Sequence, residues 1–219
     1  MHDAPISPCT AADLPAMLRV INAAAVAYHG AIPPDCWHEP YMPATELRAE
    51  IAAGVRFCGY AIDGTLVGIM GLQHSGPVDL LRHAYVLPAF QRHGIGAALL
   101  HALPTTSRPL LVGTWRTAFW AIRFYERHGF ARVPQEAIAP LLRRYWRVPS
   151  RQIESSIVLA SPPECVQEAL EREPICETRR LPVLEQRQSN TRSGGSARSG
   201  LAPNQTTNTP DHAGATHGR

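Results

Sequence analysis

Residues 86–100 read Val86-Leu-Pro-Ala-Phe-Gln-Arg-His-Gly-Ile-Gly-Ala-Ala-Leu-Leu100, a run in which an apolar strand passes through a turn into a helix rich in alanine and leucine. Glycines at positions 94 and 96 leave the main chain uncovered where that helix begins. The free N–H groups of a helix's first turn, together with the positive end of its dipole, form a binding site for an anion. The stretch therefore predicts a phosphate site built from peptide nitrogens, with the basic side chain of Arg92 beside it.

Two other kinds of glycine-rich phosphate site are excluded. A dinucleotide-binding fingerprint would need a third glycine at position 99, which is a leucine in this chain. A P-loop needs a lysine, and the chain has none, because all 21 of its basic residues are arginine. The same absence excludes a lysine nucleophile and a Schiff base on lysine.

The remaining pattern is Gln/Arg-x-x-Gly-x-Gly/Ala after a strand that ends in Val-x-Pro, and here it spans residues 91–96. It resembles the acyl-CoA-binding motif of the GNAT superfamily of N-acetyltransferases. A second segment, residues 121–130, is similar to that family's Ala-x-x-Phe-Tyr-x-x-x-Gly-Phe pattern, in which a helix is closed by a glycine. The two segments follow each other in the order and at about the distance that the family shows, and the resemblance covers about residues 6–159.

The order of elements predicts an α+β fold, since strands come first and strand–helix alternation follows. Asp63-Gly64 between two apolar runs is typical of a hairpin. We expect strands at 55–62, 65–73, 80–86, 110–115 and 153–159, and helices at 46–53, 94–103 and 118–128. The resemblance implies a GNAT-type central mixed, mostly antiparallel sheet that is flanked by helices, with a splayed fourth and fifth strand.

Composition divides the chain into residues 1–160, the expected acetyltransferase domain, and a low-complexity tail at 161–219. No aromatic residue follows Trp146, and from Glu185 onward the chain is mostly Gln, Ser, Asn, Thr, Gly, Pro and Arg. Such a segment buries too little apolar surface to offset the entropy of ordering it, so we expect disorder there.

Charge and cysteine content exclude several partners. A formal net charge of +3 is too weak to favour nucleic acid or an anionic membrane, and no apolar run approaches the roughly 18 residues of a membrane span. The five cysteines are scattered without a Cys-x-x-Cys pair, which argues against both a disulfide framework and a metal site. We therefore expect a cytoplasmic protein that needs no metal.

The resemblance implies that acetyl-CoA is the co-substrate. The main chain of Tyr85 and Val86 would pair with the pantetheine amides, and the Val86 N–H would polarise the thioester carbonyl. Peptide nitrogens between Arg92 and Ala97 would hold the pyrophosphate. The family's frequent asparagine seven residues before its tyrosine is Ala118 here, which leaves a side-chain contact from that position in doubt. The expected cofactor-binding residues are Tyr85, Val86, Gln91, Arg92, His93, Gly94, Ile95, Gly96 and Ala97.

Two catalytic residues are expected from the same comparison. Tyr125 matches the family's tyrosine, which gives a proton to the departing thiolate. The base that takes a proton from the acceptor amine is chosen among several residues, because the usual strand position is occupied by Leu80 and Arg82, which cannot serve. His83 would face the opposite side of the strand unless a bulge intervenes. We select Glu39, in a loop rich in aromatic residues, with its neighbour His38 and a water relay as alternatives.

The sequence thus predicts an N-acetyltransferase that moves an acetyl group to a primary amine of a small molecule, by direct attack on the thioester. If Arg82 faces the pocket, it would pair with a carboxylate of the acceptor, which would then be amino-acid-like or a peptide. The alternative is an acyl-CoA-binding module that senses its ligand without catalysis. A homodimer is a further option, and neither nucleic acid nor a membrane is expected as a partner.

Overall fold

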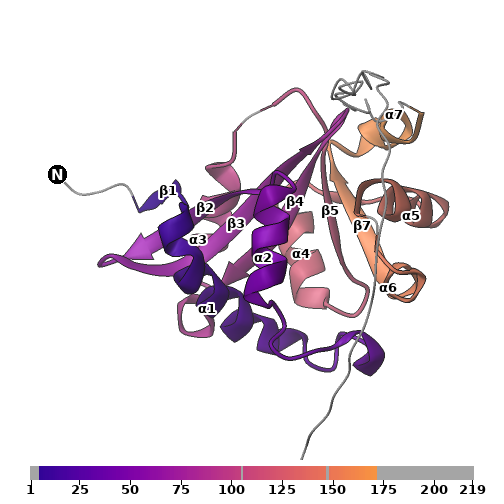
Figure 1. Cartoon of the computed structure of the whole chain (residues 1–219). Helices are drawn as coiled ribbons and strands as arrows, with labels where there is room; N and C mark the ends of the chain where they lie inside the picture. Colours follow the sequence, from indigo (N-terminus) through magenta and orange to yellow (C-terminus); the bar gives the residue numbers. More distant parts are fainter. Residues whose placement is uncertain (1–4, 105, 147, 172–219) are drawn as a thin grey trace, which may run out of the picture. The chain divides into compact units, whose positions relative to one another are not determined.

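The computed structural model describes residues 5–104, 106–146 and 148–171, and these residues form a mixed sheet with helices on both faces (Figure 1). The strands are β1 (Ile6–Pro8), β2 (Arg56–Ile62), β3 (Thr65–Ser75), β4 (Val78–Val86), β5 (Leu110–Trp115), β6 (Ala131–Arg132) and β7 (Ser156–Ser161). They lie in the order β1-β2-β3-β4-β5-β7-β6. All neighbours are antiparallel except β4 and β5, which confirms the predicted mixed, mostly antiparallel sheet.

The helices are α1 (Leu14–Ala25), α2 (Ala44–Ala52), α3 (Ile95–His101), α4 (Phe119–Arg127), α5 (Gln135–Leu141), α6 (Ser150–Glu154) and α7 (Val166–Glu171). Short 3₁₀ turns add η1 (Ala11–Asp13), η2 (Val26–Tyr28), η3 (Pro34–Cys36), η4 (Pro88–Phe90) and η6 (Pro163–Cys165), and η5 (Leu142–Trp146) is a π-helical turn after α5. None of the described helices is long and apolar enough to cross a membrane.

Two apolar clusters cover the two faces of the sheet. On one face, Met17 and Ile21 of α1 and Leu47 of α2 pack with Ile69 of β3. On the other face, Leu99 of α3 and Ile122 of α4 join a larger cluster. The neighbours Ile69 and Met70 of β3 fall in different clusters, since successive side chains of a strand point to opposite faces. Figure 1 shows α1 and α2 crossing one face of the sheet.

The hairpin between β2 and β3 forms where the sequence predicts it. Asp63 and Gly64 both have positive φ, at 48° and 71°, as a two-residue type I′ turn requires. The expected last strand is displaced, because Ile153 belongs to α6 and β7 begins only at Ser156. Pro149 precedes α6 with an extended backbone, and a proline just before the first turn favours a helix start over a strand.

The parallel pair of β4 and β5 is short. Its register runs only from Asp79 opposite Leu110 to Leu81 opposite Val112, although β4 continues to Val86 and β5 to Trp115. Beyond these three residue pairs the strands part, and the resulting opening in the sheet is the predicted splay.

Packing continues past residue 160, where the sequence analysis places the domain end. Ala169 of α7 is fully buried, and its carbonyl accepts a hydrogen bond from the Tyr145 hydroxyl at 2.7 Å. All of α7 lies in the same compact unit as the sheet, so α7 belongs to the domain. The predicted disorder of the tail concerns residues that lie mostly outside the described part of the chain.

Shortening the chain tests the role of α7. A variant that ends at residue 160 should have a free energy of unfolding lower by at least about 2 kcal/mol than one that ends at residue 177. Loss of α7 exposes the apolar surface that Val166 covers, and it leaves the Tyr145 hydroxyl without its hydrogen-bond acceptor. Urea titration of both variants measures the difference, and equal stability would show that α7 contributes nothing.

Candidate active site

The predicted phosphate turn lies between the end of β4 and α3. Gly94 stands immediately before α3 in the left-handed conformation, with φ at 78°, and Arg92 also has positive φ, at 65°. The side chain of Gln91 fixes the turn, since its Nε2 donates to the carbonyl of Val86 at 3.1 Å. A Cβ at position 96 would come within 3.3 Å of the Phe124 ring. The two glycines thus allow the left-handed turn and the close approach of α3 to α4.

A cavity of about 410 Å³ opens over this turn. Arg127 and His128 from the end of α4 line it together with Arg92, so basic groups gather at one cavity. Eight of the nine predicted cofactor-binding residues line it: Tyr85, Val86, Gln91, Arg92, Gly94, Ile95, Gly96 and Ala97. The exception is His93, whose Nδ1 pairs with the carbonyl of Gln91 at 2.9 Å instead.

The main chain of β4 is open along this cavity at Val86. Val86 lies opposite Gly68, and the N–H of Leu87 donates to the carbonyl of Val67 at 2.8 Å. In an antiparallel ladder this makes Val86 and Gly68 a non-hydrogen-bonded pair, so the N–H and C=O of Val86 point away from β3. They face the side on which β5 has parted from β4. The N–H of Val86 is therefore directed into the opening, whereas its C=O also accepts a hydrogen bond from Nε2 of Gln91.

The same alternation changes the role of Tyr85. Its pair with Ile69 is the hydrogen-bonded one, so its main-chain groups are directed at β3. The main-chain pairing with pantetheine expected of Tyr85 is not available in this register. Tyr85 instead contributes its ring, which packs edge-on against Tyr28 and Tyr41 at centroid distances of 6.2 Å each.

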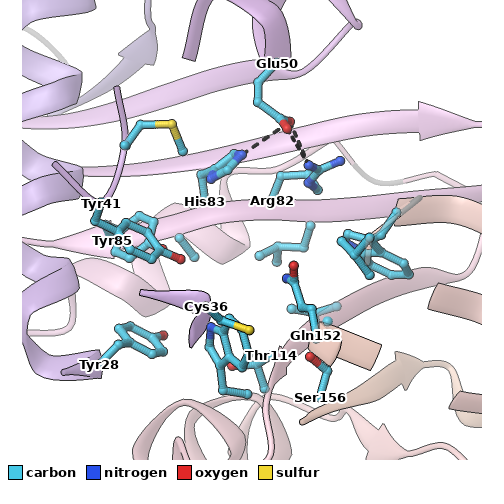
Figure 2. Close-up of a pocket in the computed structure, with 18 of the residues that line it drawn as sticks. Tyr28, Cys36, Tyr41, Glu50, Arg82, His83, Tyr85, Thr114, Gln152 and Ser156 are labelled. Carbon is cyan, nitrogen blue, oxygen red and sulfur yellow. Dashed lines mark hydrogen bonds and ion pairs between the residues drawn. The ribbon is translucent and has the colours of Figure 1, made fainter. Parts of the chain in front are cut away.

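A second cavity, of about 280 Å³, lies on the other side of the opening (Figure 2). Figure 2 shows Glu50, Arg82 and His83 on one wall. Thr114 of β5, Gln152 of α6 and Ser156 of β7 form the facing wall, and the tyrosine rings lie at one end (Figure 2). Polar groups on two walls with aromatic rings between them are typical of a site for a small polar molecule.

Four residues line both cavities: Tyr28, Ala84, Tyr85 and Tyr125. Tyr125 is buried on α4, with its ring 5.4 Å from that of Phe130. Burial raises the pKa of Tyr125 far above its ordinary value, and it raises the pKa of Tyr28 to about 12, with a smaller contribution from Tyr41. Both hydroxyls stay protonated at neutral pH, so each can donate a proton or a hydrogen bond where the two cavities meet.

A β-bulge in β4 brings Arg82 and His83 to the same carboxylate. Tyr85 lies opposite Ile69 and Arg82 opposite Gly71, so His83 and Ala84 share the single partner position of Met70, and His83 has φ at 51°. Arg82 contacts Glu50 at 2.7 Å, and Nε2 of His83 lies 3.3 Å from Oε2 of the same residue. The condition that the sequence analysis set for His83, an intervening bulge, is therefore met.

The two loop residues considered as bases, Glu39 and His38, differ in whether they line a cavity. Glu39 is exposed, accepts a hydrogen bond from Nε1 of Trp37 at 3.4 Å, and is absent from the described lining of both cavities. Its neighbour His38 does line the second cavity. Arg82 is held by Gln73 as well as by Glu50, at 2.8 Å from each acceptor oxygen, so its guanidinium is not free for an acceptor carboxylate.

Sequence reasoning missed Glu50, which is half-buried on α2 and holds two residues of β4. No signal in the sequence marks it, since it follows Glu46 by one helical turn and both read as solvent-facing charges. It also missed Gln152 and Ser156, because the last strand was expected three residues too early. No three His, Cys, Asp or Glu side chains gather as a metal site within the described residues.

Comparison with known proteins agrees with this geometry. A family model described as an acetyltransferase (GNAT) domain matches residues 53–132. The PaiA N-acetyltransferase of Thermoplasma acidophilum, solved with coenzyme A, is 19% identical and has a TM-score of 0.54, with 71% of this chain and 96% of that chain covered. The ribosomal-protein-S18-alanine N-acetyltransferase of Escherichia coli is 19% identical at a TM-score of 0.50, with 71% and 90% covered.

A GNAT-family acetyltransferase of Staphylococcus aureus Mu50 is 16% identical at a TM-score of 0.50, with 71% of this chain and 96% of that chain covered. Identities this low establish a shared fold. A comparison with curated protein sequences gives no match.

Replacement of Glu50 by glutamine tests the ion pairs at the second cavity. Burial opposes ionisation of Glu50, but His83 and Arg82 outweigh it, so the pKa of Glu50 is lowered on folding. The folded protein then binds this proton less tightly than the unfolded chain, and the stabilisation is present above the ordinary pKa and lost as the pH falls through the lowered one. Glu50→Gln should cost about 1–3 kcal/mol of unfolding free energy at neutral pH.

The difference between wild type and Glu50→Gln should shrink as the pH falls below the ordinary glutamate value. Urea titrations from neutral to acid pH measure it. Glu46→Gln, one turn earlier on the same helix and exposed, is the matched control and should change stability little at any pH. A cost at Glu50 that does not vary with pH would contradict the electrostatic explanation.

Proposed function

We infer that the chain is an acetyltransferase of the GNAT superfamily, since a model of that family matches residues 53–132, and we propose that it transfers the acetyl group of acetyl-CoA to a primary amine of a small molecule. The observation that supports this proposal most directly is that the two cavities share four lining residues, Tyr28, Ala84, Tyr85 and Tyr125. A thioester held in the larger cavity would meet an amine held in the smaller one at this junction. Direct attack therefore needs no covalent intermediate on the protein.

Residues of the larger cavity fit coenzyme A. The left-handed turn at Gly94 uncovers the peptide nitrogens that precede α3, and Arg92 and Arg127 add positive charge for phosphate. The C=O of Val86, which accepts a hydrogen bond from Nε2 of Gln91 at 3.1 Å, would also accept one from an amide of the pantetheine arm, as in an added strand. Tyr85 would contact the arm through its ring. His93 would act on the turn through its bond to Gln91.

Acyl transfer makes two demands on this chain. The acceptor nitrogen must lose a proton before it attacks, since an alkylamine is mostly an ammonium ion at neutral pH. As the C–N bond forms and the C–S bond breaks, the thiolate must gain a proton. Tyr125 would supply it, because it lines both cavities and its hydroxyl is kept protonated by burial. The N–H of Val86 would donate to the carbonyl oxygen while negative charge develops there.

The smaller cavity supports a small acceptor. A volume of about 280 Å³ suits a small molecule or a single side chain. An acceptor carboxylate would have to displace Glu50 from Arg82, so we propose an acceptor selected by its amine and by neutral polar groups. Hydrogen-bonding groups of the acceptor would face Gln152 and Ser156. Glu39 remains a predicted base whose position does not favour it. The cytoplasmic location and a homodimer likewise stay predictions.

Thiol release with a panel of amines tests the proposed reaction. Acetyl-CoA should raise the thermal midpoint, since a ligand that binds only the native state stabilises it. Addition of alkyl amines, arylalkyl amines, diamines, and amino acids with their methyl esters should release free thiol for at least one class. Binding of acetyl-CoA without thiol release across the panel would favour the non-catalytic sensor instead. Absence of binding at millimolar concentration would contradict both readings.

The Tyr125→Phe variant tests the proposed proton donor. It removes the hydroxyl and keeps the buried ring, so acetyl-CoA affinity should stay nearly unchanged while turnover falls at least about tenfold. Calorimetry gives the affinity and thiol release gives the turnover. Tyr145→Phe is the control for loss of a buried tyrosine hydroxyl, because Tyr145 is absent from the described lining of both cavities. Full turnover in Tyr125→Phe would remove this residue from the mechanism.

A further inference from the structure

The bulge in β4 gives one strand two successive side chains on one cavity wall. In a regular strand Arg82 and His83 would point to opposite faces. Both reach Glu50, at 2.7 Å and 3.3 Å, because the left-handed backbone of His83 turns its side chain to the face of Arg82. A residue other than glycine is held in this conformation only where surrounding contacts enforce it, and such positions cluster at functional sites.

We propose that His83 is the general base that removes a proton from the acceptor's ammonium group, and that Glu50 is the positioning residue that orients its imidazole. The inference rests on the proposed acetyl transfer and assigns the proton acceptor that this reaction needs.

The imidazole of His83 contacts Glu50 and lines the acceptor cavity. Its Nε2 lies 3.3 Å from Oε2 of Glu50, and both atoms are buried without a hydrogen-bond partner, so the contact is an ion-pair approach and not a formed hydrogen bond. The Phe57 ring stacks on the imidazole with a centroid distance of 5.9 Å. In the proposed assignment the tautomer with hydrogen on Nε2 faces this carboxylate, and Nδ1 keeps its lone pair for a proton.

Competing groups around the same cavity are poorer bases. Glu50 has a lowered pKa and is engaged by Arg82, so its carboxylate holds a proton weakly. Burial raises the pKa of Tyr28, Tyr41 and Tyr85, which keeps these phenols protonated.

Three further titratable groups border the cavity, and burial raises the pKa of one of them, the Cys36 thiol. Glu46 on α2 is exposed. His38 in the loop is exposed, and its Nδ1 is occupied by the carbonyl of Pro40 at 2.9 Å. Imidazole changes charge between about pH 5 and 8, so His83 is the group whose chemistry and place both suit the transfer.

The protons of the reaction balance. One ammonium proton passes to Nδ1 of His83 and is later released to solvent. The neutral amine attacks the thioester carbonyl, the C–N bond forms and the C–S bond breaks. As the tetrahedral adduct collapses, the thiolate takes a proton from Tyr125, and the second proton lost from the nitrogen replaces it on the Tyr125 phenolate, directly or through solvent. The net products are the amide, the free thiol and one proton.

Removal of the imidazole tests the base. His83→Gly suits the left-handed backbone and leaves space for free imidazole. With ethylamine as probe, the His83→Gly variant should have a kcat/KM about 100-fold lower than the wild type. Added imidazole should raise the kcat/KM of the variant at least about tenfold. The acetyl-CoA affinity measured by calorimetry should stay within about twofold, because His83 does not line the coenzyme cavity. His101→Gln, an exposed histidine outside both cavities, is the control.

A second probe separates a base from a merely structural residue. Trifluorinated ethylamine has nearly the size of ethylamine but is already neutral at neutral pH, so it needs no base. His83→Gly should change its rate by less than about threefold. Glu50→Gln should lower the rate with ethylamine more than with the fluorinated amine, and His83→Asn, which also tolerates a left-handed backbone, should behave like the glycine variant without rescue.

Results that contradict the role of His83 differ from results that contradict the proposed acetyl transfer. Equal losses with both amines and no rescue by imidazole would overturn the assignment of His83, as would full activity of His83→Gly with ethylamine. No thiol release by the wild-type protein with any amine would overturn the proposed function, and this inference with it. The differential loss together with rescue supports both.

Discussion

Strands β4 and β5 are paired only from Asp79–Leu110 to Leu81–Val112, and beyond that point none of the described strands pairs with this edge of β4. The paired end is anchored by Asp79, whose buried carboxylate contacts His74 and accepts a hydrogen bond from Thr106 at 2.7 Å. Its N–H donates to the carbonyl of Pro109 at 2.9 Å. One end of the pair is fixed while the other is open, so the sheet contains a gap lined by main-chain donors and acceptors.

The gap explains why the molecule has two cavities with different linings. The larger one combines peptide nitrogens, glycines and arginines, which suit phosphate and amides. The smaller one combines aromatic rings with carboxylate, imidazole and amide groups, which suit a small polar molecule. Because a sheet normally seals its two faces from each other, only an opening between strands lets the two linings share Tyr28, Ala84, Tyr85 and Tyr125.

Burial and ion pairing set the proton chemistry at the junction in opposite directions. Apolar surroundings keep the phenols of Tyr28, Tyr85 and Tyr125 protonated. On the facing wall, Arg82 and His83 keep the carboxylate of Glu50 ionised despite partial burial. Protonated phenols and an ionised carboxylate therefore lie on different sides of the same small space, and the proposed mechanism uses the first as acid and the second to orient a base.

Local patterns in the sequence determined the elements, the phosphate turn and the helix that carries Tyr125, because glycine positions, hairpin signals and apolar periodicity act over a few residues. Eight of the nine residues that they predict to bind a coenzyme line one cavity. Only the tertiary structure decided the acceptor side. Side chains of a regular strand alternate between the two faces of the sheet, and the bulge at His83 breaks this alternation. Glu50 lies 32 residues before Arg82, on another element. Contacts of that kind depend on how α2 packs on the sheet, which no local pattern encodes.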